Sequence, residues 1–176
     1  MKGREYVIQF VSLSAGEHKF DFEVKDSFFE HLEYSEIKKS NIVVDLTLLK
    51  QSSMMALEFE ISGTVKANCD LCTEEFDLPI SGSYKLMVKV GGADADEEND
   101  DIITIAANEH ELDLAQYIYE YITLSLPIKR VHPDNKKGVP GCDKKILKNV
   151  KDYLVEDHHE NEIDPRWEQL KNIKLN

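Results

Sequence analysis

Three cysteines and one histidine are the side chains of this chain whose types and spacing best suit metal binding. Cys69 and Cys72 are separated by two residues, and His132 and Cys142 follow far downstream. A two-residue gap lets both thiolates point at one ion, and a closed zinc site needs two further ligands. We therefore predict a structural zinc site with the ligand set Cys69, Cys72, His132 and Cys142.

Several alternatives stay open for these residues. His158 or His159 could replace His132, or the fourth ligand position could be empty. The cysteines could also be three reduced, partly buried thiols. A further alternative is a small redox or metal-responsive switch protein that uses the Cys69/Cys72 pair. Thioredoxin-type pairs, however, place the first cysteine at a helix N-terminus, and strands are expected on both sides of this pair.

Two long runs of alternating apolar and polar residues flank the cysteine pair. They cover residues 55–68 and 75–90. A period of two is typical of a strand with one buried face, and a short polar loop between two such runs predicts an antiparallel hairpin. We expect the C-x2-C loop at the tip of this hairpin, where the sheet would position both thiols.

Other segments predict the elements around the hairpin. A helix is expected over 113–126, with Asp113 and Gln116 as a capping box and Pro127 as its end. A short terminal helix is expected after Asp164 and Pro165. Further strands are expected at 6–11, 18–24, 41–50 and 102–106, and short helices at 26–34 and 143–154. These elements predict an α+β fold: a mainly antiparallel sheet with a long hairpin, one long helix and a short C-terminal helix.

Composition and length limit the class of protein. The chain has 176 residues, of which 41% are hydrophobic and 31% charged, which suits a single globular domain over 1–176. It has no apolar run of about 18 residues to span a membrane, and its N-terminus lacks the apolar region of a signal peptide. An odd number of cysteines does not suit a disulfide framework. We expect a cytoplasmic protein without a membrane partner.

The charge distribution bears on partners. A net charge of −13 argues against simple binding to nucleic-acid phosphates and suits a basic protein partner, although it could serve solubility alone. Residues 91–101 are an acidic run that predicts a solvated loop, with docking of a basic partner as the alternative. Residues 128–163 are predicted to be mostly irregular, and the basic stretch 129–145 within them is the local candidate for RNA contacts, with a solvated loop as its alternative.

Catalytic motifs are missing from the sequence. It has no G-x-S-x-G, no H-E-x-x-H and no glycine-rich phosphate loop after a strand. Its many carboxylates are no evidence for acid–base chemistry, because an acidic chain always offers carboxylate pairs. We therefore predict a non-enzymatic protein with no small-molecule substrate.

The order of these landmarks resembles the YceD family, the large ribosomal RNA subunit accumulation proteins of bacteria, with relatives in plastids. The matching pieces span about residues 55–176, and the first 50 residues fit only as strands of variable sequence. Some relatives carry a second C-x2-C in the downstream loop, where this chain has Cys142 alone. The pieces are VKANCDLCTEEF, DLAQYIYEYITLSLPIKRVHP, GVPGC and DPRWEQLKNIK.

The resemblance carries expectations about function. It implies a role in the synthesis, processing or stability of large-subunit ribosomal RNA, with no enzymatic activity. We expect the direct partner to be a basic ribosomal or assembly protein, and pre-ribosomal RNA is a second candidate. The resemblance also carries over Cys69, Cys72, His132 and Cys142 as the family's cysteine and histidine positions.

Overall fold

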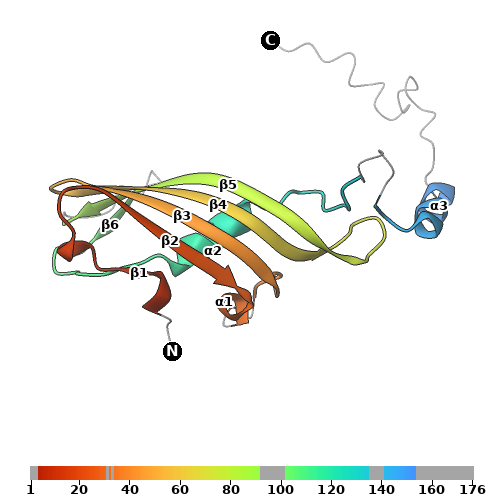
Figure 1. The fold of residues 1–176 in the computed structure, drawn as a ribbon, viewed down its shortest axis with the longest axis horizontal. Coiled ribbons are helices and arrows are strands. Elements are labelled where there is room, and N and C mark those ends of the chain that lie inside the picture. Colours follow the sequence, from red (N-terminus) through yellow and green to blue (C-terminus); the bar gives the residue numbers. More distant parts are fainter. Residues whose placement is uncertain (1–3, 31, 33, 92–101, 135–140, 154–176) are drawn as a thin grey trace, which may run out of the picture.

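A five-stranded sheet forms most of the structure. The computed structural model describes residues 4–30, 32, 34–91, 102–134 and 141–153. The sheet has the order β2-β3-β4-β5-β6, in which β2 to β5 are antiparallel neighbours and β6 runs parallel to β5. Figure 1 shows an elongated, twisted sheet. Its strands are β2 (Gly16–Lys25), β3 (Ser40–Lys50), β4 (Met54–Asn68), β5 (Glu75–Val90) and β6 (Ile102–Ile105).

The β4–β5 hairpin confirms the prediction from the alternating runs. Its register is continuous from the Met54–Lys89 pair to the Asn68–Glu75 pair, so the turn between the strands begins at Cys69. Along β4 the side chains of Leu57, Phe59 and Ile61 are buried while those between them are exposed. The sheet therefore buries one face and leaves the other open.

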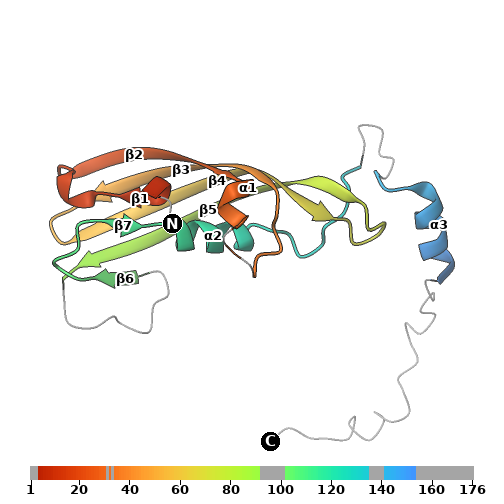
Figure 2. The same ribbon diagram turned by 90° about the horizontal axis from the view of Figure 1, so that it is seen from below.

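The remaining elements lie against the buried face of the sheet. Figures 1 and 2 show α1, α2 and the small β1–β7 pair on the same side. Helix α2 approaches β5 where Gly82 leaves room, because a Cβ there would lie 2.5 Å from Ser125 Oγ. The rings of Tyr84 and Tyr121 also stack there, with centroids 4.6 Å apart. These elements are β1 (Val7–Ile8), β7 (Leu112–Asp113), α1 (Asp26–Glu30) and α2 (Ala115–Leu124).

The predicted α+β class with one long helix is wrong, because the described chain is mostly β-sheet. Its three α-helices are short: α1 has five residues, and α2 and α3 (Lys144–Tyr153) have ten each. The helix expected over 113–126 loses its first residues because Leu112 and Asp113 pair with β1. It ends at Leu124, before the predicted end at 126, because Pro127 disfavours the helical conformation of the residue that precedes it.

Two local predictions also fail. The strand expected over 6–11 is reduced to β1, with 3-10 turns at Arg4–Tyr6 and Phe10–Ser12. The capping box forms only in part: Asp113 accepts a hydrogen bond from the Ala115 N–H, but the Gln116 amide donates to Glu120 instead. The strands at 18–24, 41–50 and 102–106 and the helix at 143–154 are confirmed within two residues.

Several predictions lie outside the described residues. These are the acidic run beyond Gly91, His158 and His159, and the terminal helix after Pro165. Within the part of the chain that the structure describes, no helix is long and apolar enough to cross a membrane.

Candidate metal centre

The turn between β4 and β5 holds the first two cysteines. The Cys69 N–H donates to the Glu74 carbonyl (2.9 Å), and the Thr73 N–H donates to the Cys69 carbonyl (2.8 Å). Thr73 adopts a φ of 62°, a left-handed conformation that is rare for a β-branched residue. The backbone therefore turns sharply enough to bring both thiols to one side of the hairpin tip.

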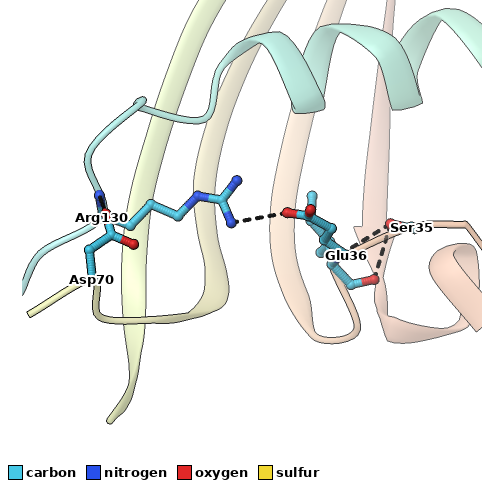
Figure 3. Close-up of polar contacts among 5 residues, drawn as sticks. Ser35, Glu36, Asp70 and Arg130 are labelled. Atoms are coloured by element: carbon cyan, nitrogen blue, oxygen red, sulfur yellow. Dashed lines mark hydrogen bonds and ion pairs between the residues drawn. The ribbon is translucent and has the colours of Figure 1, made fainter. Parts of the chain in front are cut away.

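The segment after α2 is tied to this turn by two backbone-directed hydrogen bonds. The Asp70 N–H donates to the Arg130 carbonyl (2.8 Å), and the Arg130 N–H donates to the Asp70 carboxylate (2.6 Å). Figure 3 shows Asp70 and Arg130 side by side. This reciprocal link fixes the chain two residues before His132, and so it delivers the imidazole to the thiols.

The Arg130 side chain makes a second, weaker attachment. Its guanidinium lies 3.2 Å from a Glu36 carboxylate oxygen, and Figure 3 shows it reaching across to the loop that carries Glu36. In that loop the buried Ser35 hydroxyl exchanges hydrogen bonds with Ile37. The Glu36 side chain is 77% exposed, so this ion pair contributes at most about 1 kcal/mol.

The third cysteine enters at the start of α3. Asp143 caps that helix, because its carboxylate accepts a hydrogen bond from the Lys145 N–H and its carbonyl accepts one from the Leu147 N–H. Gly141 lies so close to the other segment that a Cβ would stand 2.7 Å from the Pro133 carbonyl oxygen and 2.9 Å from His132 Cβ. Only a glycine allows this approach, which places Cys142 beside His132.

The four predicted ligands converge. Cys69 Sγ lies 3.5 Å from Cys142 Sγ, and His132 Nδ1 lies 3.4 Å from Cys72 Sγ and 3.5 Å from Cys142 Sγ. All four donor atoms lie within 4.8 Å of one another. For zinc bond lengths of about 2.3 Å to sulfur and about 2.0 Å to nitrogen, a regular tetrahedron has edges of about 3.5 to 3.8 Å. The donor set therefore fits a tetrahedral metal ion.

The site is closed to solvent. Cys69, Cys72 and Cys142 are 1%, 0% and 6% exposed, and His132 is half-buried against the ring of Phe76, with centroids 4.5 Å apart. Four protein ligands in a buried tetrahedron leave no position for a water or a substrate. An ion held in this way would have the surroundings that are typical of structural metal sites.

The pKa values of the Cys69 and Cys142 thiols are shifted in opposite directions. Burial favours the neutral form of Cys69, but the pKa of its thiol is nevertheless lowered to about 6, because backbone N–H groups and the Cys142 thiol stabilise the thiolate. Burial and the neighbouring cysteines raise the pKa of the Cys142 thiol to about 11. Two thiols in contact cannot both ionise at low cost without a cation between them.

Sequence reasoning found all four converging side chains but missed those that position them. In the sequence, Asp70 is only a polar residue between two cysteines, and Gly141 is only one residue of the basic stretch 129–145. Phe76 is only one apolar position within the alternating run 75–90. Each of these roles depends on a contact across the fold that no local pattern reports.

The fold and site together define a class: a β-sheet protein whose longest hairpin carries a cysteine–histidine cluster that could hold a metal ion, closed by a segment from far downstream. The family model of the large ribosomal RNA subunit accumulation protein YceD matches residues 57–174. The chain therefore belongs to the YceD family, as the order of its motifs predicts. The matched range contains the hairpin and all four side chains of the cluster. No match was found among the curated proteins or among the solved structures.

Proposed function

We propose that this protein is a non-enzymatic accessory factor of ribosome biogenesis that supports the accumulation of large-subunit ribosomal RNA. The description of the matching family supports this role. The observation that carries the structural part is the convergence of Cys69, Cys72, His132 and Cys142 within 4.8 Å. In this proposal they bind one zinc ion, which holds residues 128–134 and 141–153 on the tip of the hairpin.

The burial of the cysteines favours this zinc site over a redox switch. Reactive thiols in redox proteins are at least partly accessible to their partner, whereas Cys69 and Cys72 are at most 1% exposed. Cys69 also lies in a hairpin turn and not at a helix N-terminus. A Cys3His set is a common structural zinc ligand set in proteins.

The acidic charge of residues 1–127 supports a basic ribosomal or assembly protein as the partner. Residues 1–127 carry 10 Lys and Arg against 25 Asp and Glu, a net charge of −15. On the open face of the sheet, Asp21, Asp45 and Glu60 stand directly opposite one another on three adjacent strands, and all three are exposed. Like charges in this position cost stability, and a cationic surface would offset that cost. We place this interaction in the cytoplasm.

Affinity capture from a cell lysate over a series of salt concentrations tests this function. We expect the protein to recover ribosomal or assembly proteins at low salt and to lose them at high salt, because charge attraction is screened. The variant Asp21→Asn/Asp45→Asn/Glu60→Gln should recover less. Its matched control, Glu5→Gln/Glu109→Gln/Glu120→Gln, changes the net charge equally on the helix side and should recover as much as the wild type. Recovery that ignores salt, or recovery of no ribosomal component, would contradict the proposal.

A further inference from the structure

Next to the candidate metal centre, the described part of this acidic protein is basic. Residues 128–134 and 141–153 carry 6 Lys and Arg against 3 Asp, a net charge of +3 in a chain whose total is −13. Both ribbon views place α3 beyond the end of the sheet at which the β4–β5 hairpin turns (Figures 1 and 2). In the part of the chain that the structure describes, this end is therefore basic and the sheet with its covering elements is acidic.

Helix α3 exposes three lysines whose charges are not neutralised by ion pairs within the described residues. Lys144, Lys145 and Lys148 are exposed. None of the three forms an ion pair with another residue in the described ranges. Lys144 and Lys148 are four residues apart, so their ammonium groups lie on the same face of the helix. Exposed Lys129, in the segment that precedes His132, adds to this charge at the same end of the molecule.

The positions of these lysines do not stabilise α3. Lys144 and Lys145 occupy the first turn, where the positive end of the helix dipole disfavours cations, and the Asp143 cap is the one acidic residue beside them at this end of α3. Two lysines at i and i+4 repel each other by a few tenths of a kcal/mol. Both effects reduce the stability of the helix, and an external polyanion would reverse them.

The apolar side of α3 is already in use. Ile146 and Leu147 are half-buried and pack against the core cluster that includes Cys142. An amphipathic helix that binds a membrane needs its apolar face free to enter the bilayer. Here the docked side turns the lysines outward as a fixed array, which suits a polyanion with regularly spaced surface charges.

We propose that Lys144, Lys145 and Lys148 of α3 bind the phosphate backbone of RNA, and that the metal centre holds this helix in its binding position. The choice of ribosomal RNA as the natural ligand rests on the proposed function, whereas the phosphate chemistry rests on the charge and geometry of α3. Contacts of this kind recognise the backbone and not the base sequence.

The test compares two triple variants of the full-length, zinc-supplemented protein. Lys144→Gln/Lys145→Gln/Lys148→Gln removes the α3 charges. Lys19→Gln/Lys25→Gln/Lys85→Gln removes the same number of exposed charges from β2 and β5 on the sheet. Binding to a labelled RNA hairpin is measured by fluorescence anisotropy over a range of salt concentrations, and binding to vesicles that contain phosphatidylserine is measured by co-sedimentation.

We expect the wild type and the sheet variant to bind the RNA hairpin with a similar salt dependence. The α3 variant should bind about tenfold more weakly or worse, and the steepness of log affinity against log salt should fall by about 2 to 3 for the three lysines removed. An unchanged affinity in the α3 variant, an equal loss in the sheet variant, or lysine-dependent binding to vesicles without RNA binding would overturn the inference.

The outcomes separate this inference from the proposed function. If the α3 variant binds RNA as well as the wild type but the wild type still recovers ribosomal proteins from lysate, only the inference fails. If RNA binding depends on α3 but no ribosomal component is recovered from lysate, the inference stands and the proposed function fails. Circular dichroism checks that both variants are folded. We expect spectra like that of the wild type, because the substituted lysines are exposed and, in α3, Gln is a good helix former.

Discussion

Four side chains from three separate parts of the chain form the candidate metal centre. Their types and spacing were sufficient to predict the set, because few residues bind zinc and the two-residue cysteine gap is characteristic of a turn that does so. The residues that position them were not predictable. Gly141 is needed because the Pro133 carbonyl passes 2.7 Å from where its Cβ would be, and only the fold brings these two residues together.

The substitution Gly141→Ala tests this close approach. The added methyl group must displace the Pro133 carbonyl or the His132 side chain, so the imidazole moves away from the thiols. We expect zinc affinity to fall on the order of tenfold, as it does when supporting contacts of a metal ligand are lost. Competition with a colorimetric chelator measures the change, and an affinity equal to that of the wild type would show that the site tolerates the methyl group.

The two perturbed thiols predict the pH dependence of metal binding. Metal binds thiolates, so binding releases the protons that the thiols still hold. In the metal-free protein the pKa is about 6 for Cys69 and about 11 for Cys142. Between these values Cys142 must lose a proton to bind, so zinc affinity should rise with pH. Below about 6 Cys69 must lose one as well, so affinity should fall more steeply. Isothermal titration of zinc at several pH values measures the slope, and a pH-independent affinity would contradict the thiol ligands.

Among the elements, the β4–β5 hairpin and the segment after α2 contribute most to the candidate metal centre, because they carry two cysteines and the histidine of the cluster. The alternating pattern predicted the strands of the hairpin almost to the residue. The capping box over 113–116 misled, because Asp113 belongs to a strand that pairs with β1 near the N-terminus. The link between Asp70 and Arg130 joins residues 60 positions apart, and no sequence period reports it.

A pair of substitutions separates the two attachments of this segment. Asp70→Ala removes the carboxylate that accepts the Arg130 N–H, and we expect it to cost about 1 to 2 kcal/mol of stability. Glu36→Ala removes only the exposed ion pair with Arg130 and should cost about 0.5 kcal/mol or less. Urea denaturation of the zinc-loaded proteins gives both values. Equal costs would mean that the backbone link is not the stronger attachment.

The whole molecule was predicted less well than its parts. The alternating runs correctly predicted a sheet with a hairpin. The prediction of an α+β class was wrong because the segments with helical patterns form only short helices. The buried face of one large sheet dominates the core, and α2 fits on it through Gly82 and the stacked rings of Tyr84 and Tyr121. The sequence already showed a basic stretch at 129–145, but that the exposed lysines of α3 lie beyond the acidic sheet became clear only from the position of α3.

Removing the metal should affect the two parts of the molecule differently. The β4–β5 hairpin keeps its backbone pairing and its buried face without an ion, and residues 128–131 keep the hydrogen bonds between Asp70 and Arg130. Residues 132–134 and 141–153, in contrast, would lose the link to the hairpin tip that a metal ion provides. We expect a chelator to leave the strand signal in circular dichroism nearly unchanged and to increase amide hydrogen exchange in these two ranges at least tenfold, about 1.4 kcal/mol. Uniform protection after chelation would show that the centre does not hold them.

Zinc content per chain is the most direct test of the account. Native mass spectrometry of wild-type protein, purified without chelators, should show one zinc ion per chain. Cys69→Ser should lose the ion, and His132→Ala should lose it or bind it more weakly. His110→Ala, a histidine that is exposed and outside the cluster, should keep it. A wild-type chain that is folded and free of metal would contradict the central claim, as would a Cys69→Ser variant that retains one zinc ion.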